Sequence, residues 1–343
     1  MLAWVSGRKG CITEFDGTIR SLIEIWQSDP ESPYHKLKSS TKKPYDVYAR
    51  MVIMEVGSKL IDDVDGRDVK RWFNAWAEPK IPGDPMQIPK ARTAIAVIKS
   101  ALNFGIMCRK RGCAEFKAVL VEVELPVQAS RTTAPTADDI TKVRSAARKA
   151  GHAPAALAYA IQFDGAVRQW DVIGEWVPMA DPRPSIVLDR GTKWIGPMWS
   201  QIDENQVFRF TPSKTENTTG REVAIDFTVC PMIMEELALI LNDQRKGPLI
   251  VNPMTGKPYR PDYFQKLWRS VREAQGVSQA IWNRDLRAGG ITEGRAANAS
   301  TDDLAKLAGH ADKRTTAKVY DRAQIEAGRR VAEARAAHRN RKK

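Results

Sequence analysis

The stretch LAKLAGHADKRTTAKVYDR, residues 304–322, carries the most specific pattern in this 343-residue sequence. His310 follows a glycine at the expected end of a helix, and Tyr320 comes ten residues later. An isolated tyrosine beside a helix usually packs against its neighbours, and an isolated histidine usually hydrogen-bonds at a helix end. These two residues become candidates for chemistry because basic residues at fixed places upstream complete a pattern.

Two arginines lie shortly upstream, in the segment RDLRAGGITEG at residues 284–294. Arg284 and Arg287 are three positions apart and therefore share one face of a helix. A third arginine, Arg168, follows a turn of small residues in FDGAVRQWD, residues 163–171. An arginine stays charged and holds phosphate oxygens through a bidentate fork, so this set suits a site for a phosphate group.

A lysine stands on a predicted β-hairpin between these arginines. The segment VFRFTPSKTENTTGREVAIDF, residues 207–227, alternates as two strands with a turn at residues 217–220. Lys214 lies beside that turn. Lys193 and Lys257 also lie in predicted loops of the same region and remain alternatives for the same role.

The order of these residues resembles the pattern of the tyrosine recombinases, the phage-type integrase family. That pattern has an arginine after a glycine turn, a lysine on a hairpin, an H-x-x-R box, a G-H box and a tyrosine nine or ten residues later. The matching positions here are Arg168, Lys214, Arg287, His310 and Tyr320. The resemblance covers nearly the whole chain, because the helical first part and the PTADDI junction also look like the family's core-binding domain and its linker.

The resemblance implies a two-domain fold. An all-α core-binding (SAM-like) N-terminal domain would precede a mixed α+β catalytic domain with a small antiparallel sheet. It also implies a site-specific DNA recombinase that cleaves and rejoins strands through a covalent 3′-phosphotyrosyl intermediate, with no cofactor, ATP or metal. The expected catalytic residues are Arg168, Lys214, Arg284, Arg287, His310 and Tyr320.

The residue types suit attack on a phosphodiester. A tyrosine phenol can form an ester with phosphorus, which splits one hard step into two reversible ones. Arg168 and Arg287 can neutralise the non-bridging oxygens, an effect commonly worth about 3–4 kcal/mol per donor. His310 can donate to a phosphate oxygen, and Lys214 can lend a proton to the departing 5′ oxygen. Asp171, three residues after Arg168, is expected to orient that arginine rather than to act as an acid.

Two features depart from the family pattern. Arg284 stands where the family usually has the histidine of the H-x-x-R box, which removes a candidate proton acceptor for the tyrosine. Arg284 has a second interpretation, as the partner of Asp285 or Glu293 in a surface ion pair. The stretch 171–195 is longer than the usual link to the first strand, and we interpret it as an insertion with a short hairpin of its own.

Two other functions fit parts of the same pattern. A type IB topoisomerase-like enzyme would use the same covalent chemistry to relax DNA. A DNA-binding protein on this scaffold could also have weakened or lost catalysis, which Arg284 makes conceivable. Strand exchange between two defined sites separates recombinase from topoisomerase, and a trapped phosphotyrosyl adduct separates an enzyme from a binding protein.

Charge and composition favour a nucleic-acid partner. There are 54 Lys and Arg against 41 Asp and Glu, and a net charge of +13 attracts polyanions. The four cysteines are too few and scattered for a disulfide framework or a four-ligand zinc site, and the four histidines show no metal-binding spacing. We expect neither a signal peptide nor a membrane span, and a reduced cytoplasm, of a prokaryote or a phage host, fits the sequence.

The chain divides at VEVELPVQASRTTAPTADD, where helical periodicity gives way to Pro, Ser and Thr. Five parts are expected: a leader at 1–30 with one short amphipathic helix near 19–26, a helical DNA clamp at 31–124, a linker at 125–136, a catalytic domain at 137–326 and a basic C-terminal helix or tail at 327–343.

Capping residues predict where several helices begin and end. Ser40 or Thr41 is expected to cap the first helix of the clamp, and Asp68 the second. Gly112 is expected to end the third helix. Thr136, followed by acidic residues, is expected to cap the first helix of the catalytic domain.

Basic residues of the expected clamp gather around its first and third helices, where the resembled family grips double-stranded DNA. The resemblance also implies four protomers on two DNA sites, with the C-terminal helix of one protomer docking on a neighbour. It leaves room for accessory proteins that bend DNA or set direction, and for no membrane partner. The expected phosphate contacts are Lys36, Lys38, Lys42, Lys43, Lys90, Arg92 and Lys99.

Overall fold

The computed structural model of the chain describes residues 14–129, 131–216 and 219–309. The chain separates into two compact units, Met1–Ala129 and Ser130–Lys343. The boundary falls inside residues 125–136, where composition predicts a linker. His310, Tyr320 and the basic segment 327–343 lie outside the described residues.

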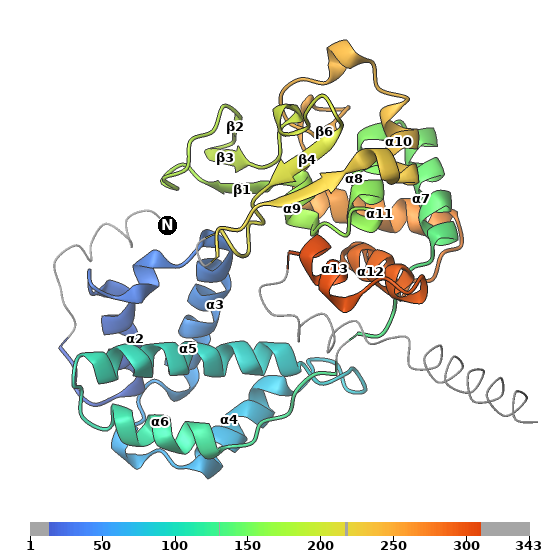
Figure 1. Cartoon of the computed structure of the whole chain (residues 1–343). Coiled ribbons are helices and arrows are strands. Elements are labelled where there is room, and N and C mark those ends of the chain that lie inside the picture. Colours follow the sequence, from blue (N-terminus) through green and yellow to red (C-terminus); the bar gives the residue numbers. More distant parts are fainter. Residues whose placement is uncertain (1–13, 130, 217–218, 310–343) are drawn as a thin grey trace, which may run out of the picture. The chain divides into compact units, whose positions relative to one another are not determined.

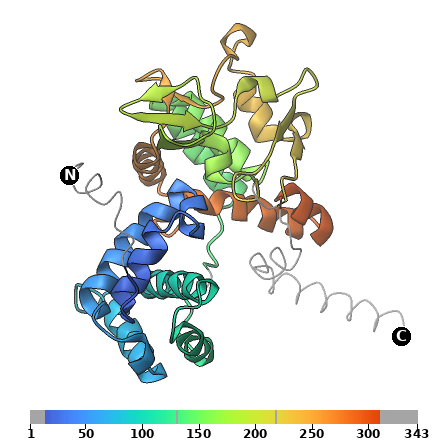
Figure 2. The ribbon, with the colours of Figure 1, turned by 90° about the vertical axis from the view of Figure 1, so that its left-hand side faces the viewer.

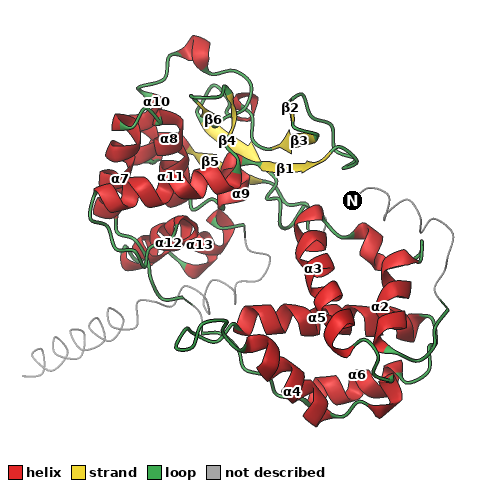
Figure 3. Ribbon diagram, turned by 180° about the vertical axis from the view of Figure 1, so that it is seen from behind, coloured by secondary structure: helices red, strands yellow, loops and turns green. Residues whose placement is uncertain are grey.

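In the first unit, helices pack around α5 (Ile88–Met107), as Figures 1 and 3 show. Small and branched apolar side chains fill its buried faces, so several helices can approach it closely. The helices that contact α5 are α2 (Ile19–Ser28), α3 (Ser39–Val56), α4 (Gly66–Ala77) and α6 (Cys113–Glu122). Two short 3₁₀ helices, η1 (Pro33–Lys36) and η2 (Ile61–Asp63), lie in the connections.

Helix α4 begins earlier than its sequence indicates. The predicted cap, Asp68, lies in the first turn, and the N-cap is Asp65. The carboxylate of Asp65 accepts the backbone N–H groups of Arg67 and Asp68, and Asp68 accepts the N–H of Asp65 in return. This reciprocal arrangement is a capping box, in which Asp68 takes the third position of the helix rather than the cap.

Other boundaries in the first unit also differ from the prediction. Helix α3 begins at Ser39, so Ser40 and Thr41 lie inside its first turn. The third predicted helix ends at Met107, whereas Gly112 has a φ of +76° and is the N-cap of α6. A left-handed backbone is inexpensive only for glycine, which explains this residue at a sharp turn between two helices. Helix α6 itself was not predicted.

Helix α2 belongs to the core of the first unit. The predicted amphipathic helix near residues 19–26 is confirmed, and Leu22, Ile23 and Trp26 on it are almost fully buried. The expected leader at 1–30 therefore includes a structural helix. Its periodicity was visible in the sequence, but the surface of α3 and α5 that it covers was not.

The second unit is organised around α8 (Ala153–Phe163), which is buried along nearly its whole length. Helices α7 (Ala137–Lys149), α10 (Pro231–Leu237) and α12 (Leu286–Ala296) pack against α8. The short α9 (Gln169–Ile173) follows α8, α11 (Pro261–Ala274) packs against α7, and α13 (Thr301–Leu307) packs against α12 (Figures 1 and 2). Thr136 caps α7 through a capping box, as predicted.

The described strands of the second unit form small antiparallel sheets. The predicted hairpin is confirmed: β4 (Val207–Phe210) pairs with β5 (Val223–Asp226). A three-stranded sheet has the order β1 (Glu175–Pro178), β3 (Thr192–Ile195), β2 (Leu188–Asp189), and β6 (Val251–Asn252) pairs with β7 (Lys257–Pro258). The unit thus combines helices with small antiparallel sheets, as a mixed α+β domain does.

The interpreted insertion, residues 171–195, holds the three-stranded sheet. Its expected hairpin is β2–β3, closed by a two-residue turn in which Arg190 and Gly191 have φ of 47° and 69°. Turns with two positive φ values match the twist of antiparallel strands. Strand β1, which was not predicted, pairs with β3 and completes the sheet.

A close contact between α12 and α8 fixes the position of α12, which carries Arg287. A Cβ atom on Gly290 would lie 2.0 Å from the backbone oxygen of Phe163 on α8. Such an overlap must be relieved by moving one helix away from the other, because a backbone atom cannot rotate aside.

We expect Gly290→Ala to lower the free energy of unfolding by at least about 1–3 kcal/mol, as overpacking does. Gly294→Ala, on the same helix, is the matched control. A Cβ there meets the flexible side chain of Leu304 at 2.8 Å, and alanine favours helix by about 1 kcal/mol over glycine. Urea unfolding of both variants measures the difference, and equal stabilities would contradict this account of the packing.

Candidate active site

A cavity of about 860 Å³ in the second unit brings the three candidate arginines together. Arg168 lies at the start of α9, Arg284 in the short η6 (Asn283–Asp285), and Arg287 in the first turn of α12. The described lining adds two more cations and one carboxylate: Arg269, Arg272 and Glu273. This surplus of positive charge suits an anionic ligand.

Arg287 holds two distant segments of the unit together. It is only 8% exposed, and its Nη1 donates a hydrogen bond to the carbonyl oxygen of Ala166 at 2.8 Å. Its Nη2 donates to the carbonyl oxygen of Ala308. Ala166 lies two residues before Arg168, and Ala308 lies two residues before His310. One guanidinium therefore fixes the chain beside two other candidate residues.

The turn before Arg168 is strained. Ala166 has a φ of +49°, a left-handed conformation that costs a non-glycine residue about 1–2 kcal/mol. Strain of this kind is commonly retained at functional sites, where the surroundings enforce it. Here the bond from Arg287 to the Ala166 carbonyl is one such constraint, and the turn delivers Arg168 to the cavity.

Asp171 joins Arg168 to the hairpin loop. One carboxylate oxygen of Asp171 lies 3.8 Å from Nη1 of Arg168, and the other accepts the backbone N–H of Ser213 at 2.8 Å. The ion pair fits the expectation that Asp171 orients this arginine. Within the described residues, Nη1 of Arg168 is buried and has no hydrogen-bond partner, and the Asp171 carboxylate is the charged group that faces it.

Arg284 is exposed and lies over the indole of Trp282, 4.4 Å from the ring centroid. The alternative ion pair with Asp285 is not observed, because Asp285 pairs with Arg131, whose Nη2 lies 2.7 Å away. No ion pair joins Arg284 to Glu293 among the described residues, and burial raises the pKa of the Glu293 carboxyl. Arg284 therefore faces the cavity without a carboxylate partner among the described residues.

The structure separates Lys214 from the two alternative lysines. Lys214 is exposed in the β4–β5 loop. Lys193 on β3 is 8% exposed and donates to the carbonyl oxygen of Asp181. Lys257 pairs with Asp189 at 2.6 Å. Both alternatives are thus committed to structural contacts, which favours Lys214 as the lysine available to a ligand.

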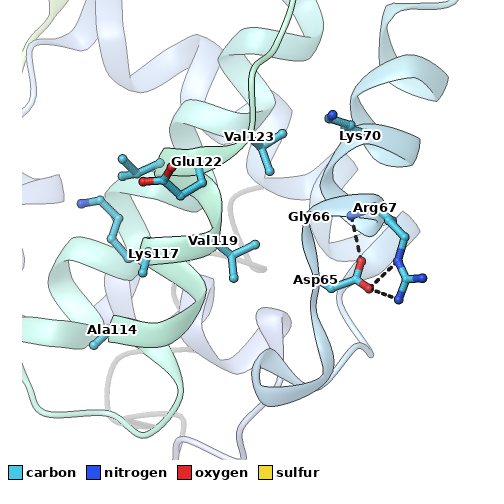
Figure 4. Close-up of a pocket in the computed structure, with 11 residues that line it drawn as sticks. Asp65, Gly66, Arg67, Lys70, Ala114, Lys117, Val119, Glu122 and Val123 are labelled. Atoms are coloured by element: carbon cyan, nitrogen blue, oxygen red, sulfur yellow. Dashed lines mark hydrogen bonds and ion pairs between the residues drawn. The ribbon is translucent and has the colours of Figure 1, made fainter.

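A second cavity, also of about 860 Å³, lies in the first unit between α4 and α6 (Figure 4). Asp65 at its edge is engaged by Arg67 and by the start of α4. Much of the described wall is apolar, with Val119 and Val123 facing it, and it contains none of the candidate catalytic residues. This cavity offers no comparable set of reactive groups.

No helix in the described ranges has the length and apolarity needed to cross a bilayer. The same ranges contain no group of three His, Cys, Asp or Glu side chains able to share a metal ion.

Comparison with solved structures identifies the fold. A lambda integrase tetramer bound to a Holliday junction aligns with a TM-score of 0.65 and 15% identity, over 94% of this chain and 84% of that chain. A lambda integrase dimer bound to a COC′ core site gives a TM-score of 0.64 and 15% identity, over 90% and 78%. The Tn1549 transposon integrase, in complex with transposon right end DNA, gives a TM-score of 0.63 and 13% identity, over 93% and 99%.

This chain has the tyrosine recombinase fold. The predicted resemblance is confirmed at that level. No protein-family model matches the sequence, and no curated protein matches it.

Several residues around the site of this recombinase fold were not singled out from the sequence. Arg131 binds Asp285 through two nitrogens and lies 4.1 Å from the Trp282 ring, so it supports the segment that carries Arg284. Arg272 is 5% exposed and donates to the carbonyl oxygens of Gln279 and Ile281.

One of these residues left a signal in the sequence. Phe264, Trp268 and Arg272 recur at four-residue spacing on the buried face of α11, so the period alone marks Arg272 as an arginine at a buried position. Nothing local marks Arg131, whose partners are more than a hundred residues away.

The seven expected DNA contacts lie on described residues of the first unit. Lys36 ends η1, Lys38 precedes α3, and Lys42 lies over the ring of Tyr34 at 4.3 Å. Arg92 donates to the carbonyl oxygen of Pro126 at 3.2 Å, so part of its guanidinium serves the fold. The others lie near the start of α3 and along α5: Lys43, Lys90 and Lys99.

Proposed function

We propose that this chain is a site-specific DNA recombinase that cleaves and rejoins strands through a covalent 3′-phosphotyrosyl intermediate at Tyr320. The convergence of Arg168, Arg284 and Arg287 in one cavity carries the proposal. The fold supports it, because the similar solved structures are integrases bound to DNA.

In the proposed reaction, the phenol oxygen of Tyr320 forms a bond to the scissile phosphorus while the bond to the 5′ oxygen breaks. Arg168 and Arg287 bind the non-bridging oxygens, where negative charge develops, and His310 donates a hydrogen bond. Lys214 gives a proton to the 5′ oxygen, and the phenol proton passes to solvent. Attack by a 5′ hydroxyl on the phosphotyrosine reverses these changes, and no ATP is needed because the ester conserves the bond.

Arg284 has a distinct place in this proposal. An arginine cannot accept the phenol proton, because its guanidinium stays protonated. It can still stabilise the phenolate, since a nearby positive charge favours the ionised form of an acid. Its exposed position on the cavity, stacked on Trp282, is compatible with that role.

The proposed assembly follows the similar structures. Lambda integrase forms a tetramer on a Holliday junction, and we extend this arrangement to four protomers of this chain on two DNA sites. Residues 31–124 would clamp the duplex, and residues 327–343 would dock on a neighbouring protomer. Strand exchange between two cloned sites tests the recombinase, whereas relaxation of supercoiled plasmid without exchange would favour the topoisomerase-like alternative.

DNA affinity is expected to fall steeply with salt. A clamp that neutralises several phosphates releases their counterions, and each contact adds about 0.9 to the log–log slope. We expect a slope steeper than about −3 for the whole chain. Lys99→Ala should make it shallower by about one unit, whereas Lys257→Ala, which removes a lysine paired with Asp189, should leave it unchanged. Fluorescence anisotropy across a salt series measures both, and a slope near −1 would rule out the clamp.

A further inference from the structure

The loop that carries Lys214 is held on both sides by the inserted segment 171–195. Immediately before the lysine, the N–H of Ser213 donates to the Asp171 carboxylate at 2.8 Å. Two residues after it, the carboxylate of Glu216 lies 3.8 Å from Nη1 of Arg183. Lys214 itself is exposed, so its position depends on how the loop is held.

The side chain of Arg183 is held in place by two carboxylates of the inserted segment. It is about a quarter exposed, and its Nε and Nη2 each bind the Asp181 carboxylate at 2.9 Å. The same Nη2 donates to Glu175, the first residue of β1, at 2.9 Å. These bonds use two of its nitrogens and leave Nη1 directed at Glu216. The inserted sheet therefore presents a rigid cation to the loop.

The other anchor, Asp171, connects the loop to the arginine site. Its side chain is 2% exposed and lies 3.8 Å from Arg168. A displacement of the loop at Ser213 would therefore move the Asp171 carboxylate and change its distance to Arg168.

We propose that Arg183 is a positioning residue for Lys214. Asp171 holds the loop at Ser213, before the lysine, and Arg183 holds it at Glu216, after the lysine. The inference rests on the proposed function, in which Lys214 protonates the leaving 5′ oxygen. A long lysine side chain delivers its proton efficiently only when its backbone is fixed near the acceptor. In this proposal the insertion acts on catalysis through the contact between Arg183 and the Glu216 carboxylate.

The competing interpretation is that Arg183 only stabilises the inserted sheet, through Asp181 and Glu175. Glu216→Gln separates the two, because it removes the ion pair with Arg183 and leaves those bonds intact. Arg183→Met removes both. Arg190→Ala is the matched control: this arginine also belongs to the insertion, is 87% exposed, and forms no hydrogen bond or ion pair with the described residues of the loop.

The test compares two nicked suicide substrates, one with the natural oxygen at the cleaved position and one with sulfur. A sulfur leaving group needs no proton, because a thiol ionises near pH 8.5 and an alcohol far above it. We expect Glu216→Gln and Arg183→Met to slow covalent-adduct formation on the oxygen substrate about two- to fivefold, as loss of a partly exposed ion pair allows. On the sulfur substrate both should match the wild type. The double variant should be no slower than Arg183→Met alone.

Amide hydrogen exchange of residues 207–216 in the free protein provides a readout independent of activity. It should quicken in Glu216→Gln and Arg183→Met but not in Arg190→Ala. Unchanged exchange in both variants, or equal slowing on both substrates, would overturn the inference while leaving the recombinase intact. If the wild type forms no adduct with either substrate, the proposed function fails, and the exchange result still decides whether Arg183 holds the loop.

Discussion

Arg287→Ala is expected to lower the rate of DNA cleavage by at least about 10²–10³-fold, the usual effect of removing one donor to a developing negative charge. The loss should exceed that of a phosphate contact alone, because Arg287 also bonds to the carbonyl oxygens of Ala166 and Ala308. Without it, the strained turn before Arg168 and the segment before His310 each lose a constraint.

The same substitution should reduce stability. Each buried carbonyl left without a donor costs about 1–3 kcal/mol, so the free energy of unfolding should fall by at least that amount. Arg287→Lys restores the charge, but an ammonium group cannot reproduce the planar guanidinium that donates to two carbonyl oxygens. It should therefore recover little of the cleavage rate or of the stability. Adduct formation, measured well below the unfolding midpoint of each variant, separates chemistry from folding. An alanine variant that is fully stable and cleaves within tenfold of the wild type would contradict this role.

The sequence predicted those parts of the site that follow from the spacing of neighbouring residues and from the order of the motif residues in the resembled family. Arg284 and Arg287 are three positions apart in the sequence, and Arg168 follows a small-residue turn, so their segments were recognisable. The hairpin of Lys214 was also visible, because β4 and β5 alternate. That the three arginines line one cavity follows from the packing of α12 against α8, which local spacing does not encode.

The features that escaped prediction depend on distant partners. Arg131 lies in the predicted linker, yet it binds Asp285, which is 154 positions later in the sequence. Helix α2 reads as a leader until the core that receives it is known. Arg183 gave no local signal, since its contact with Glu216 requires the inserted sheet and the β4–β5 loop to be neighbours. Amphipathic periods reveal that a face is buried, but not what buries it.

Tyr320→Phe bears most directly on the central claim. It removes one oxygen and keeps the aromatic ring, so folding and DNA affinity should change little. Covalent chemistry should disappear completely, because the phenylalanine ring has no nucleophile to attack phosphorus. Six other tyrosines serve as internal comparisons, among them Tyr159 and Tyr259, which are fully buried in the core of the second unit.

The decisive measurement is a protein–DNA band on a denaturing gel, formed on a suicide substrate nicked near the scissile phosphate and incubated in EDTA. We expect the wild type to give the band, with the DNA joined through its 3′ phosphate to the peptide that contains Tyr320, and Tyr320→Phe to give none. A band that persists in Tyr320→Phe would show that another residue is the nucleophile, and the account of this protein as a recombinase acting through Tyr320 would be wrong.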